Sequence, residues 1–227
     1  MQNNCHWHFL ETADQVAQVV CQRILESAQL AIKQRGRFKL VLAGGSTPEK
    51  VYALLANSTA DWPLWHIYYG DERCLPEQHQ DRNSLMASRV LLEKVAIPSS
   101  QIYTIPAELG PEQAAERYGK IVADALPFDL VLLGMGEDGH TASLFPGHQH
   151  QLDELAHAVY NSPKPPPERV SMSAKALSDT HQLAFLITGS SKQEAVIQWR
   201  SGKDLPVATI TPTVPVDIYI DRAAFDF

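Results

Sequence analysis

A run of apolar residues ends abruptly at a glycine-rich turn that carries two carboxylates and an imidazole. The run is Leu130–Leu133, and the turn after it reads Gly-Met-Gly-Glu-Asp-Gly-His over residues 134–140. A His beside an Asp in such a loop can act as a general base with an orienting partner. Because open α/β sheets bind ligands beyond the carboxyl ends of their strands, Asp138 and His140 are the first candidates for catalysis.

A second glycine-rich turn is suited to hold an anion. Gly44, Gly45, Ser46 and Thr47 lie between an apolar run and an amphipathic segment that opens with Pro48. Backbone N–H groups at a helix start attract phosphate, and Ser46 or Thr47 can cap the helix. The turn matches neither a Walker sequence nor a GxGxxG fingerprint, so a nucleotide is not expected. An ordinary strand-to-helix turn is the plainer alternative.

A charged triplet follows another apolar run. Asp71 and Arg73 stand directly after residues 67–70, and Asn83 comes a few residues later. The planar guanidinium of Arg73 can clamp a phosphate or a developing oxyanion. We therefore expect these side chains to form one wall of the same site, although a charged triplet at a strand end is often only a solvated loop.

Three more cations are candidates for binding an anion. Lys192 follows a Thr-Gly-Ser-Ser turn between an expected strand and an expected helix, which again favours anion binding. Lys164 lies in the proline-rich segment 161–168, whose composition is typical of a linker, and Arg169 follows it. For any single Lys or Arg, a solvated surface charge is the usual role.

Composition limits the class of protein. The chain has 227 residues, 44% of them hydrophobic, and a net charge of −7, which favours one domain over residues 1–227. It has no Lys/Arg-rich run and no apolar stretch of membrane-spanning length, so neither nucleic acid nor a membrane is expected as a partner. The polar segment 1–10 does not resemble a signal peptide. Three cysteines, an odd number, indicate a cytoplasmic protein, and His148-x-His150 lacks a third metal ligand, so no metal is expected.

The apolar pattern predicts alternating strands and helices. Strands are expected at residues 38–43, 67–70, 101–105, 128–133, 158–161, 182–188 and 216–220. Helices are expected from Thr12 to Gly36, after Pro48, and at residues 83–95, 111–126 and 191–199. This alternation is typical of an α/β fold, with a doubly wound, mostly parallel sheet and helices on both faces.

Together these segments resemble the 6-phosphogluconolactonase family, within the glucosamine/galactosamine-6-phosphate isomerase superfamily. The likeness rests on residues 44–48, 71–73 and 134–146 in this order, with support from 162–166, 169–173 and 189–192. It covers about residues 10 to 225. It implies a Rossmann-like three-layer sandwich of the NagB type. It also implies hydrolysis of 6-phospho-D-glucono-1,5-lactone to 6-phospho-D-gluconate in the oxidative pentose phosphate pathway, without a cofactor and as a monomer.

The resemblance also implies roles for single residues. His140 corresponds to the catalytic base and Asp138 to its partner in the same loop. Asp71 and Arg73 correspond to residues that contact the substrate, and Lys192 to a phosphate-binding lysine. Because Asp138 is so close in sequence to His140, its orienting role stays open at this point.

One departure from the family pattern concerns the residue before Asn83. Family members often have Ser-Asn where this chain has Arg82-Asn83, so Asn83 is kept as a binding residue and no role is given to Arg82. An ester carbonyl needs an activated water and a stabilised oxyanion, which His140 and either Arg73 or a loop N–H would supply. The chain has no Gly-x-Ser-x-Gly elbow, which argues against a covalent acyl-enzyme.

Two other functions remain open. Glucosamine-6-phosphate isomerase/deaminases share the fold, but their turn usually continues Ile-Gly-Phe-Asn-Glu-Pro, where residues 141–146 read Thr-Ala-Ser-Leu-Phe-Pro. Their strand-end motif usually reads Asp-Glu-Tyr, where this chain has Arg73. A sugar-phosphate-sensing regulator domain can also share the fold, but it normally follows a helix-turn-helix module. Here only one expected helix precedes the first expected strand, and the chain is acidic.

Overall fold

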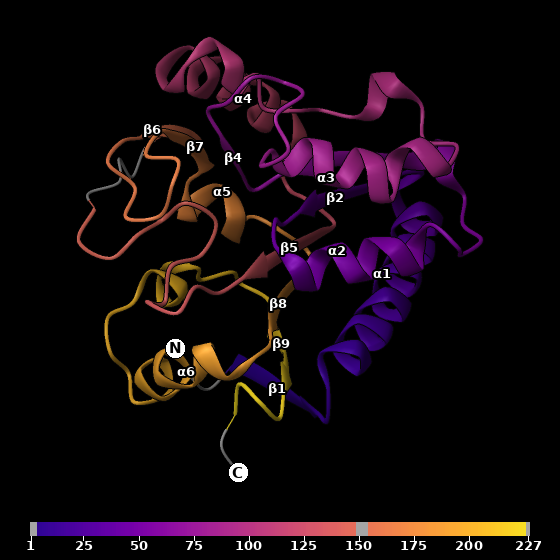
Figure 1. The fold of residues 1–227 in the computed structure, drawn as a ribbon. Coiled ribbons are helices and arrows are strands. Elements are labelled where there is room, and N and C mark those ends of the chain that lie inside the picture. Colours follow the sequence, from indigo (N-terminus) through magenta and orange to yellow (C-terminus); the bar gives the residue numbers. More distant parts are fainter. Residues whose placement is uncertain (1–3, 149–153, 226–227) are drawn as a thin grey trace.

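The computed structural model describes residues 4–148 and 154–225, and its centre is a parallel sheet of six strands (Figure 1). The strands follow one another across the sheet in the order β1-β9-β8-β5-β2-β3. They are β1 (Cys5–Leu10), β9 (Val216–Asp221), β8 (Leu183–Ile187), β5 (Leu130–Gly134), β2 (Phe38–Leu42) and β3 (Trp65–Tyr69). Every residue of β2 and β8 is buried, as expected for strands covered on both faces.

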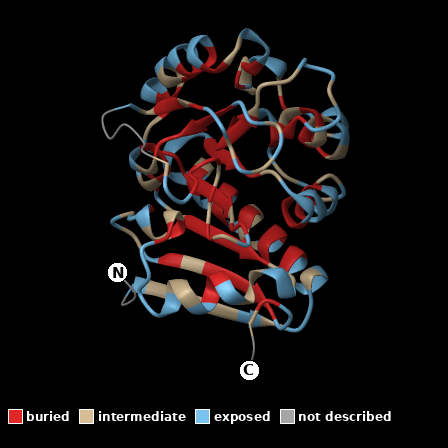
Figure 2. Cartoon of the chain, turned by 60° about the vertical axis from the view of Figure 1, so that its left-hand side comes forward, coloured by how far each residue is buried: buried red, intermediate tan, exposed pale blue. Residues whose placement is uncertain are grey.

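Helices cover both faces of this sheet. Figure 1 shows α1 (Ala13–Arg35), α2 (Ser46–Leu55) and α3 (Asn83–Val90) on one side, and α5 (Ala174–Ser178) and α6 (Gln193–Arg200) on the other. Figure 2 shows the buried strands between the exposed outer faces of the helices. This arrangement confirms the predicted doubly wound α/β fold. No helix within residues 4–148 and 154–225 is long and apolar enough to cross a membrane.

A small antiparallel sheet stands beside the carboxyl end of β3. Its strands, in the order β4-β7-β6, are β4 (Asp71–Arg73), β7 (Arg169–Met172) and β6 (Ala156–Val159). The helix α4 (Pro111–Ala125) packs on it, and the hydroxyl of Tyr118 bonds the backbone N–H and C=O of Tyr69 at 2.8 and 3.0 Å. The charged triplet 71–73 is therefore a short strand, and not the solvated loop that was the alternative interpretation.

Several short 3₁₀ helices complete the described elements. They are η2 (Trp62–Leu64), η3 (Leu92–Lys94), η4 (Ser99–Gln101), η5 (Ala107–Leu109), η6 (Ser190–Lys192) and η7 (Pro206–Thr209).

The structure differs from the predicted elements in three places. The strand β1, which precedes α1, was not predicted. Residues 101–105 do not form a strand, because η4 covers the first of them and only Ile102 makes a bridge, to Ile67. The helix expected over residues 83–95 ends at Val90, since Leu91 leaves helical geometry at φ −128°. His150 lies outside the described residues.

The order of the strands creates a switch point between β2 and β5. From β2 the chain moves outward to β3, returns to β5 on the other side of β2, and continues away through β8 to β9. The carboxyl ends of β2 and β5 are therefore neighbours whose following segments diverge, which is where open α/β sheets bind ligands. These two ends carry the glycine-rich turns at residues 43–45 and 134–140.

Candidate active site

A cleft of about 220 Å³ opens at this switch point. Its walls come from the segments that follow β2, β3, β5 and β8, together with the first residue of β7. Eight of the predicted site residues line it: Gly44, Gly45, Asp71, Arg73, Asn83, His140, Arg169 and Lys192. The other four, Ser46, Thr47, Asp138 and Lys164, do not.

His140 and Asp138 face each other within the turn after β5. The Nδ1 atom of His140 lies 2.5 Å from Oδ1 of Asp138, which also accepts the backbone N–H of His140 at 3.2 Å. The carboxylate thereby favours the tautomer that carries its proton on Nδ1, and Nε2 is left to accept a proton. The orienting geometry that the sequence left open is therefore present.

Burial governs the electrostatics of this pair. Burial lowers the pKa of His140, while the carboxylates of Asp138 and Asp71 oppose the shift. Burial alone would raise the pKa of Asp138, but the charge and hydrogen bonds of His140 outweigh it and hold that pKa below its usual value. The imidazole is consequently neutral near pH 7, which is the state that a general base needs.

Gly136 provides the space that the imidazole occupies. A Cβ on Gly136 would lie 2.0 Å from Nδ1 of His140 and 2.7 Å from Oδ1 of Asp138. The ring of Phe145 also contacts the imidazole, with centroids 4.7 Å apart. A hydrogen bond of 2.8 Å from Gly136 N–H to the carbonyl of His140 closes the turn. The imidazole is thus held in one place by the carboxylate, the bare glycine and the phenyl ring.

Asp71 is held from three directions. Ser143 Oγ donates to its Oδ2 at 2.5 Å, Asn83 Nδ2 donates to its Oδ1 at 3.1 Å, and an Arg169 nitrogen lies 3.9 Å from Oδ2. A buried carboxylate with both oxygens engaged is a fixed negative charge and acceptor. Sequence analysis assigned no role to Ser143, because the neighbouring Leu144 and Phe145 are typical of a protein core.

Glu72 and Arg82 form a buried support beneath Asn83. Glu72 is fully buried and accepts the first backbone N–H groups of α3, from Asn83 and Ser84, at 2.8 Å each. Arg82 Nε lies 3.1 Å from the same carboxylate. Glu72, a residue of β4, thus caps the start of the helix α3. Asn83 is held so close to Gly44 that a Cβ on Gly44 would lie 2.1 Å from Asn83 Oδ1. Sequence patterns do not show such a non-local cap.

Two arginines near Asp71, Arg73 and Arg169, make different hydrogen bonds. Arg73 donates to the carbonyl of Asp81 at 2.5 Å, and its Nε is buried with no hydrogen-bond partner among the described residues. Arg169 is 4% exposed and donates to three carbonyls in the proline-rich segment, those of Lys164, Pro165 and Pro166. That segment is therefore fixed against the site, and the comparison with a linker was wrong.

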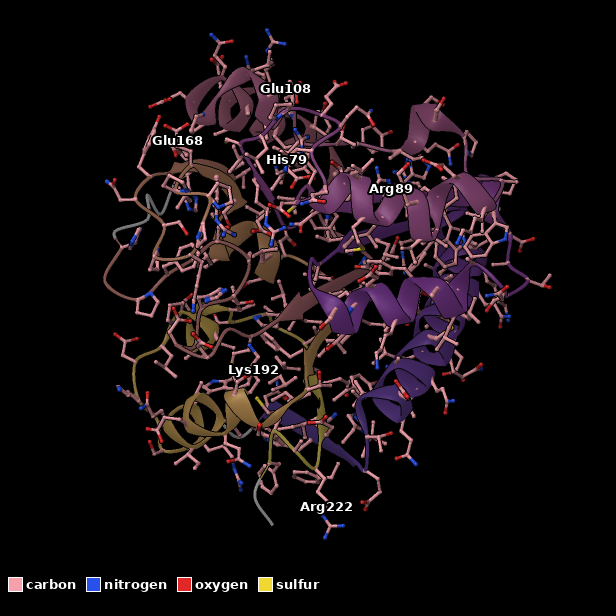
Figure 3. All side chains as sticks on the ribbon, in the orientation of Figure 1. His79, Arg89, Glu108, Glu168, Lys192 and Arg222 are labelled. Atoms are coloured by element: carbon pink, nitrogen blue, oxygen red, sulfur yellow. The ribbon has the colours of Figure 1, made fainter. Side chains whose placement is uncertain are left out.

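The two candidate lysines also differ. Lys192, at the end of η6 beside α6 (Figure 3), lines the cleft, and burial lowers its pKa although Glu137 and Asp138 oppose the shift. Lys164 instead forms an ion pair with Glu137 in the turn after β5. Lys192 is therefore the better placed of the two for an anion in the cleft.

The start of α2 differs from its predicted capping. Gly45 is the N-cap residue, and no side chain of Ser46 or Thr47 caps the helix. Ser46 is exposed, whereas Thr47 is buried with its Oγ1 2.6 Å from Oγ1 of Thr188. This bond ties the start of α2 to the end of β8, so that Gly45 and Lys192 share one cleft.

Comparison with known proteins identifies the family. A family model described as glucosamine-6-phosphate isomerases/6-phosphogluconolactonase matches residues 11–218. The chain belongs to this family. Among curated members, a rice protein (Oryza sativa subsp. indica) named probable 6-phosphogluconolactonase 3, chloroplastic, is 37% identical over 205 residues, which are 80% of this chain and 63% of the relative. The 6-phosphogluconolactonase 3 of Arabidopsis thaliana, also chloroplastic, is 32% identical over 213 residues, 85% and 66% of the two chains.

The matched region is only part of each of these relatives. This chain spans just under two thirds of the length of the curated rice and Arabidopsis relatives. Their names place them in the chloroplast, so the cytoplasmic location of this chain stays a prediction.

Solved structures of the same family share the fold. A 6-phosphogluconolactonase from Thermotoga maritima matches with a TM-score of 0.88 and 28% identity, over 95% of this chain and 98% of that one. A second from Trypanosoma brucei matches with a TM-score of 0.87 and 27% identity, over 97% of both chains. A monomeric glucosamine-6-phosphate deaminase of the NagB superfamily, 21% identical with a TM-score of 0.84 over 96% of this chain and 98% of that one, shares the fold alone. The NagB-type fold is thereby confirmed.

Proposed function

We propose that this chain hydrolyses 6-phospho-D-glucono-1,5-lactone to 6-phospho-D-gluconate, the second step of the oxidative pentose phosphate pathway. The observation that carries the proposal is the pair of Asp138 and His140, with Nδ1 engaged at 2.5 Å and Nε2 left to take a proton. Support comes from the family match and from relatives named for this activity. Basic side chains at the cleft suit a phosphorylated substrate.

The reaction begins with a water molecule at His140. Nε2 takes a proton from the water as its oxygen bonds to the lactone carbonyl carbon, and Asp138 stabilises the resulting imidazolium. The tetrahedral intermediate collapses by breaking the bond between the carbonyl carbon and the ring oxygen. The imidazolium then returns the proton to that oxygen, which becomes a hydroxyl of the open-chain acid. One water is added, and His140 ends in its starting state.

Arg73 is proposed to stabilise the oxyanion. It lines the cleft, and its buried Nε lacks a hydrogen-bond partner among the described residues. An unsatisfied buried donor costs free energy, so an acceptor supplied by the substrate would recover that cost. Asp71, fixed by Ser143 and Asn83, is proposed to accept hydrogen bonds from substrate hydroxyls.

The phosphate is proposed to bind at the other side of the turn after β5. Lys192 supplies a charge there, and Gly44, Gly45 and the start of α2 supply backbone N–H groups and a positive dipole. The bond between Thr47 and Thr188 holds these two parts together. Lys164 contributes to this binding only by exchanging its partner Glu137 for the phosphate.

A coupled assay tests the proposal. Glucose-6-phosphate dehydrogenase generates the lactone in place, and phosphogluconate dehydrogenase reports the product as a second NADPH. We expect an acceleration above spontaneous hydrolysis that is lost in His140→Ala and kept in His181→Ala, a matched change at an exposed histidine. An unchanged rate, or full activity in His140→Ala, would contradict the proposal. Ammonia release from glucosamine-6-phosphate would then test the deaminase alternative.

A further inference from the structure

A second hollow, of about 240 Å³, lies at the opposite edge of the central sheet, where β2 and β3 begin. Three basic side chains line it, Arg37, Lys39 and His66, together with the rings of Tyr68 and Tyr103. The catalytic cleft lies at the carboxyl ends of the same two strands, so the two hollows are separated by the length of the strands.

The basic residues are arranged in a way that costs stability. Lys39 and His66 are directly opposite each other in the register of β2 and β3, and Arg37 precedes Lys39 by two residues and shares its side of the chain. Arg37 and Lys39 carry like charges on this side of the chain, and their mutual repulsion is destabilising. Within residues 4–148 and 154–225, no carboxylate oxygen lies within 4 Å of any side-chain nitrogen of Arg37, Lys39 or His66.

The ammonium of Lys39 is largely withdrawn from water. Lys39 is 9% exposed, and its Nζ donates to the backbone carbonyl of Ala125. The carboxylate of Asp129 is already engaged, by Arg35 Nε at 2.6 Å and by the backbone N–H of Lys39 at 2.7 Å. Burial lowers the pKa of Lys39, and the charge of Arg37 lowers it further, while Asp129 opposes the shift. The hollow therefore holds more positive than negative charge close to its walls.

Aromatic rings make one wall of the hollow flat. Tyr103 stacks on Tyr68 with centroids 4.7 Å apart and an angle of 8° between the rings. His66 lies nearly parallel to Tyr103 at 6.2 Å. Burial lowers the pKa of His66, as do Arg37 and Lys39, against the opposing charge of Asp129. Low-dielectric walls of this kind strengthen the attraction between the cations and an anion.

We propose that this hollow is a second anion site, which takes an oxyanion of the phosphate class between Arg37, Lys39 and His66. Its basic residues form one compact group, which suits a free phosphate or one phosphate group of a larger molecule. Asp124 of α4 also lines the hollow and is exposed. Its carboxylate repels a ligand that carries a second negative group beside its phosphate. The inference goes beyond the proposed hydrolysis and does not depend on it.

The ring resonances of His66 provide a local readout in nuclear magnetic resonance, assigned with His66→Gln. On titration with inorganic phosphate, we expect a saturable shift of these resonances and a rise in the pKa of His66. Arg37→Gln should weaken the Kd by at least about tenfold, because a hydrogen bond to a charged group is lost. Arg89→Gln, a matched change at an exposed arginine of α3 (Figure 3), should leave the Kd unchanged.

A second titration, with 6-phosphogluconate, separates the two sources of phosphate. A shift of His66 with both compounds assigns the site to phosphate esters as well as the free ion, and a shift with inorganic phosphate alone assigns it to the free ion. No saturable shift of His66 with phosphate would overturn the proposal, and so would an equal Kd in Arg37→Gln and Arg89→Gln. Because Arg37 is exposed, the circular dichroism spectrum and melting temperature of Arg37→Gln should match those of the parent protein, and they report that the variant is folded.

Discussion

Replacing Gly136 by Ala is a direct test of the placement of His140. The added Cβ would lie 2.0 Å from Nδ1 and 2.1 Å from Cε1 of the imidazole, where ordinary contacts begin near 3.4 Å. The ring must therefore retreat by roughly 1.4 Å, which breaks its 2.5 Å contact with Asp138. A misplacement of about 1 Å in an active site can cost about 100-fold in rate, or about 2.7 kcal/mol of transition-state stabilisation. We expect kcat for the lactone to fall by at least that factor.

The measurement is steady-state kinetics in the coupled assay, with circular dichroism and thermal unfolding as checks of the fold. Gly119→Ala is the control. Gly119 lies within the helix α4, and a Cβ on it would be 3.9 Å from its nearest neighbouring atom, which is an ordinary contact. This control should keep full kcat and gain up to about 1 kcal/mol of stability from helix propensity. A folded Gly136→Ala protein whose kcat stays within about threefold of the parent would refute the positional argument, since general-base catalysis contributes about 100-fold or more.

Three further predictions concern the pair, the phosphate and the buried support. Burial holds the pKa of His140 below its ordinary value, so kcat/KM should fall only below about pH 6.5. Asp138 opposes that shift, so in Asp138→Asn the acid limb of the profile should move to still lower pH. The plateau of kcat/KM should also drop about 100-fold in this variant. A pH–rate profile of both proteins checks this, and an acid limb that moves upward in the variant would contradict it. Lys192→Ala should raise KM for the phosphorylated lactone by about tenfold or more and leave the weak hydrolysis of unphosphorylated gluconolactone unchanged; equal effects on both substrates would argue against phosphate binding. Glu72→Gln should lower the free energy of unfolding by about 2 kcal/mol, because charge-assisted hydrogen bonds to Arg82 and to the start of α3 are weakened while Arg82 keeps its pair with Glu108. A melting temperature lower by roughly 4–8 °C would show it.

The sequence predicted the centre of the site better than its supports. The turn with Asp138 and His140, the bare loop at Gly44 and the position of Asp71 all follow apolar runs, and the carboxyl ends of parallel strands meet at one edge. Local patterns were therefore enough to bring these residues together. The pairing of Asp138 with His140 depends on the turn geometry that Gly136 permits, which spacing alone does not give.

The supports could not be predicted because they are made by residues far apart in the chain. Ser143 reaches Asp71 across 72 positions, and Arg169 holds a segment whose composition resembles a linker. The strand β1 did leave a signal, since Trp7 and Phe9 alternate with histidines at the period of a strand. That run is short and polar, so propensity alone did not distinguish it from an irregular segment.

The position of β1 also affects how the protein is made. Its neighbour in the sheet is β9, and Cys5 pairs in register with Val216. At a synthesis rate of about 5–20 residues per second, β1 waits roughly 10 to 40 s for its partner β9. Late in that time β8 is also made, and it presents a second unpaired edge next to an incomplete core until β9 follows. Until β9 emerges from the ribosome, the nascent chain is therefore exposed to aggregation at both strands, and chaperone binding is most useful in this interval.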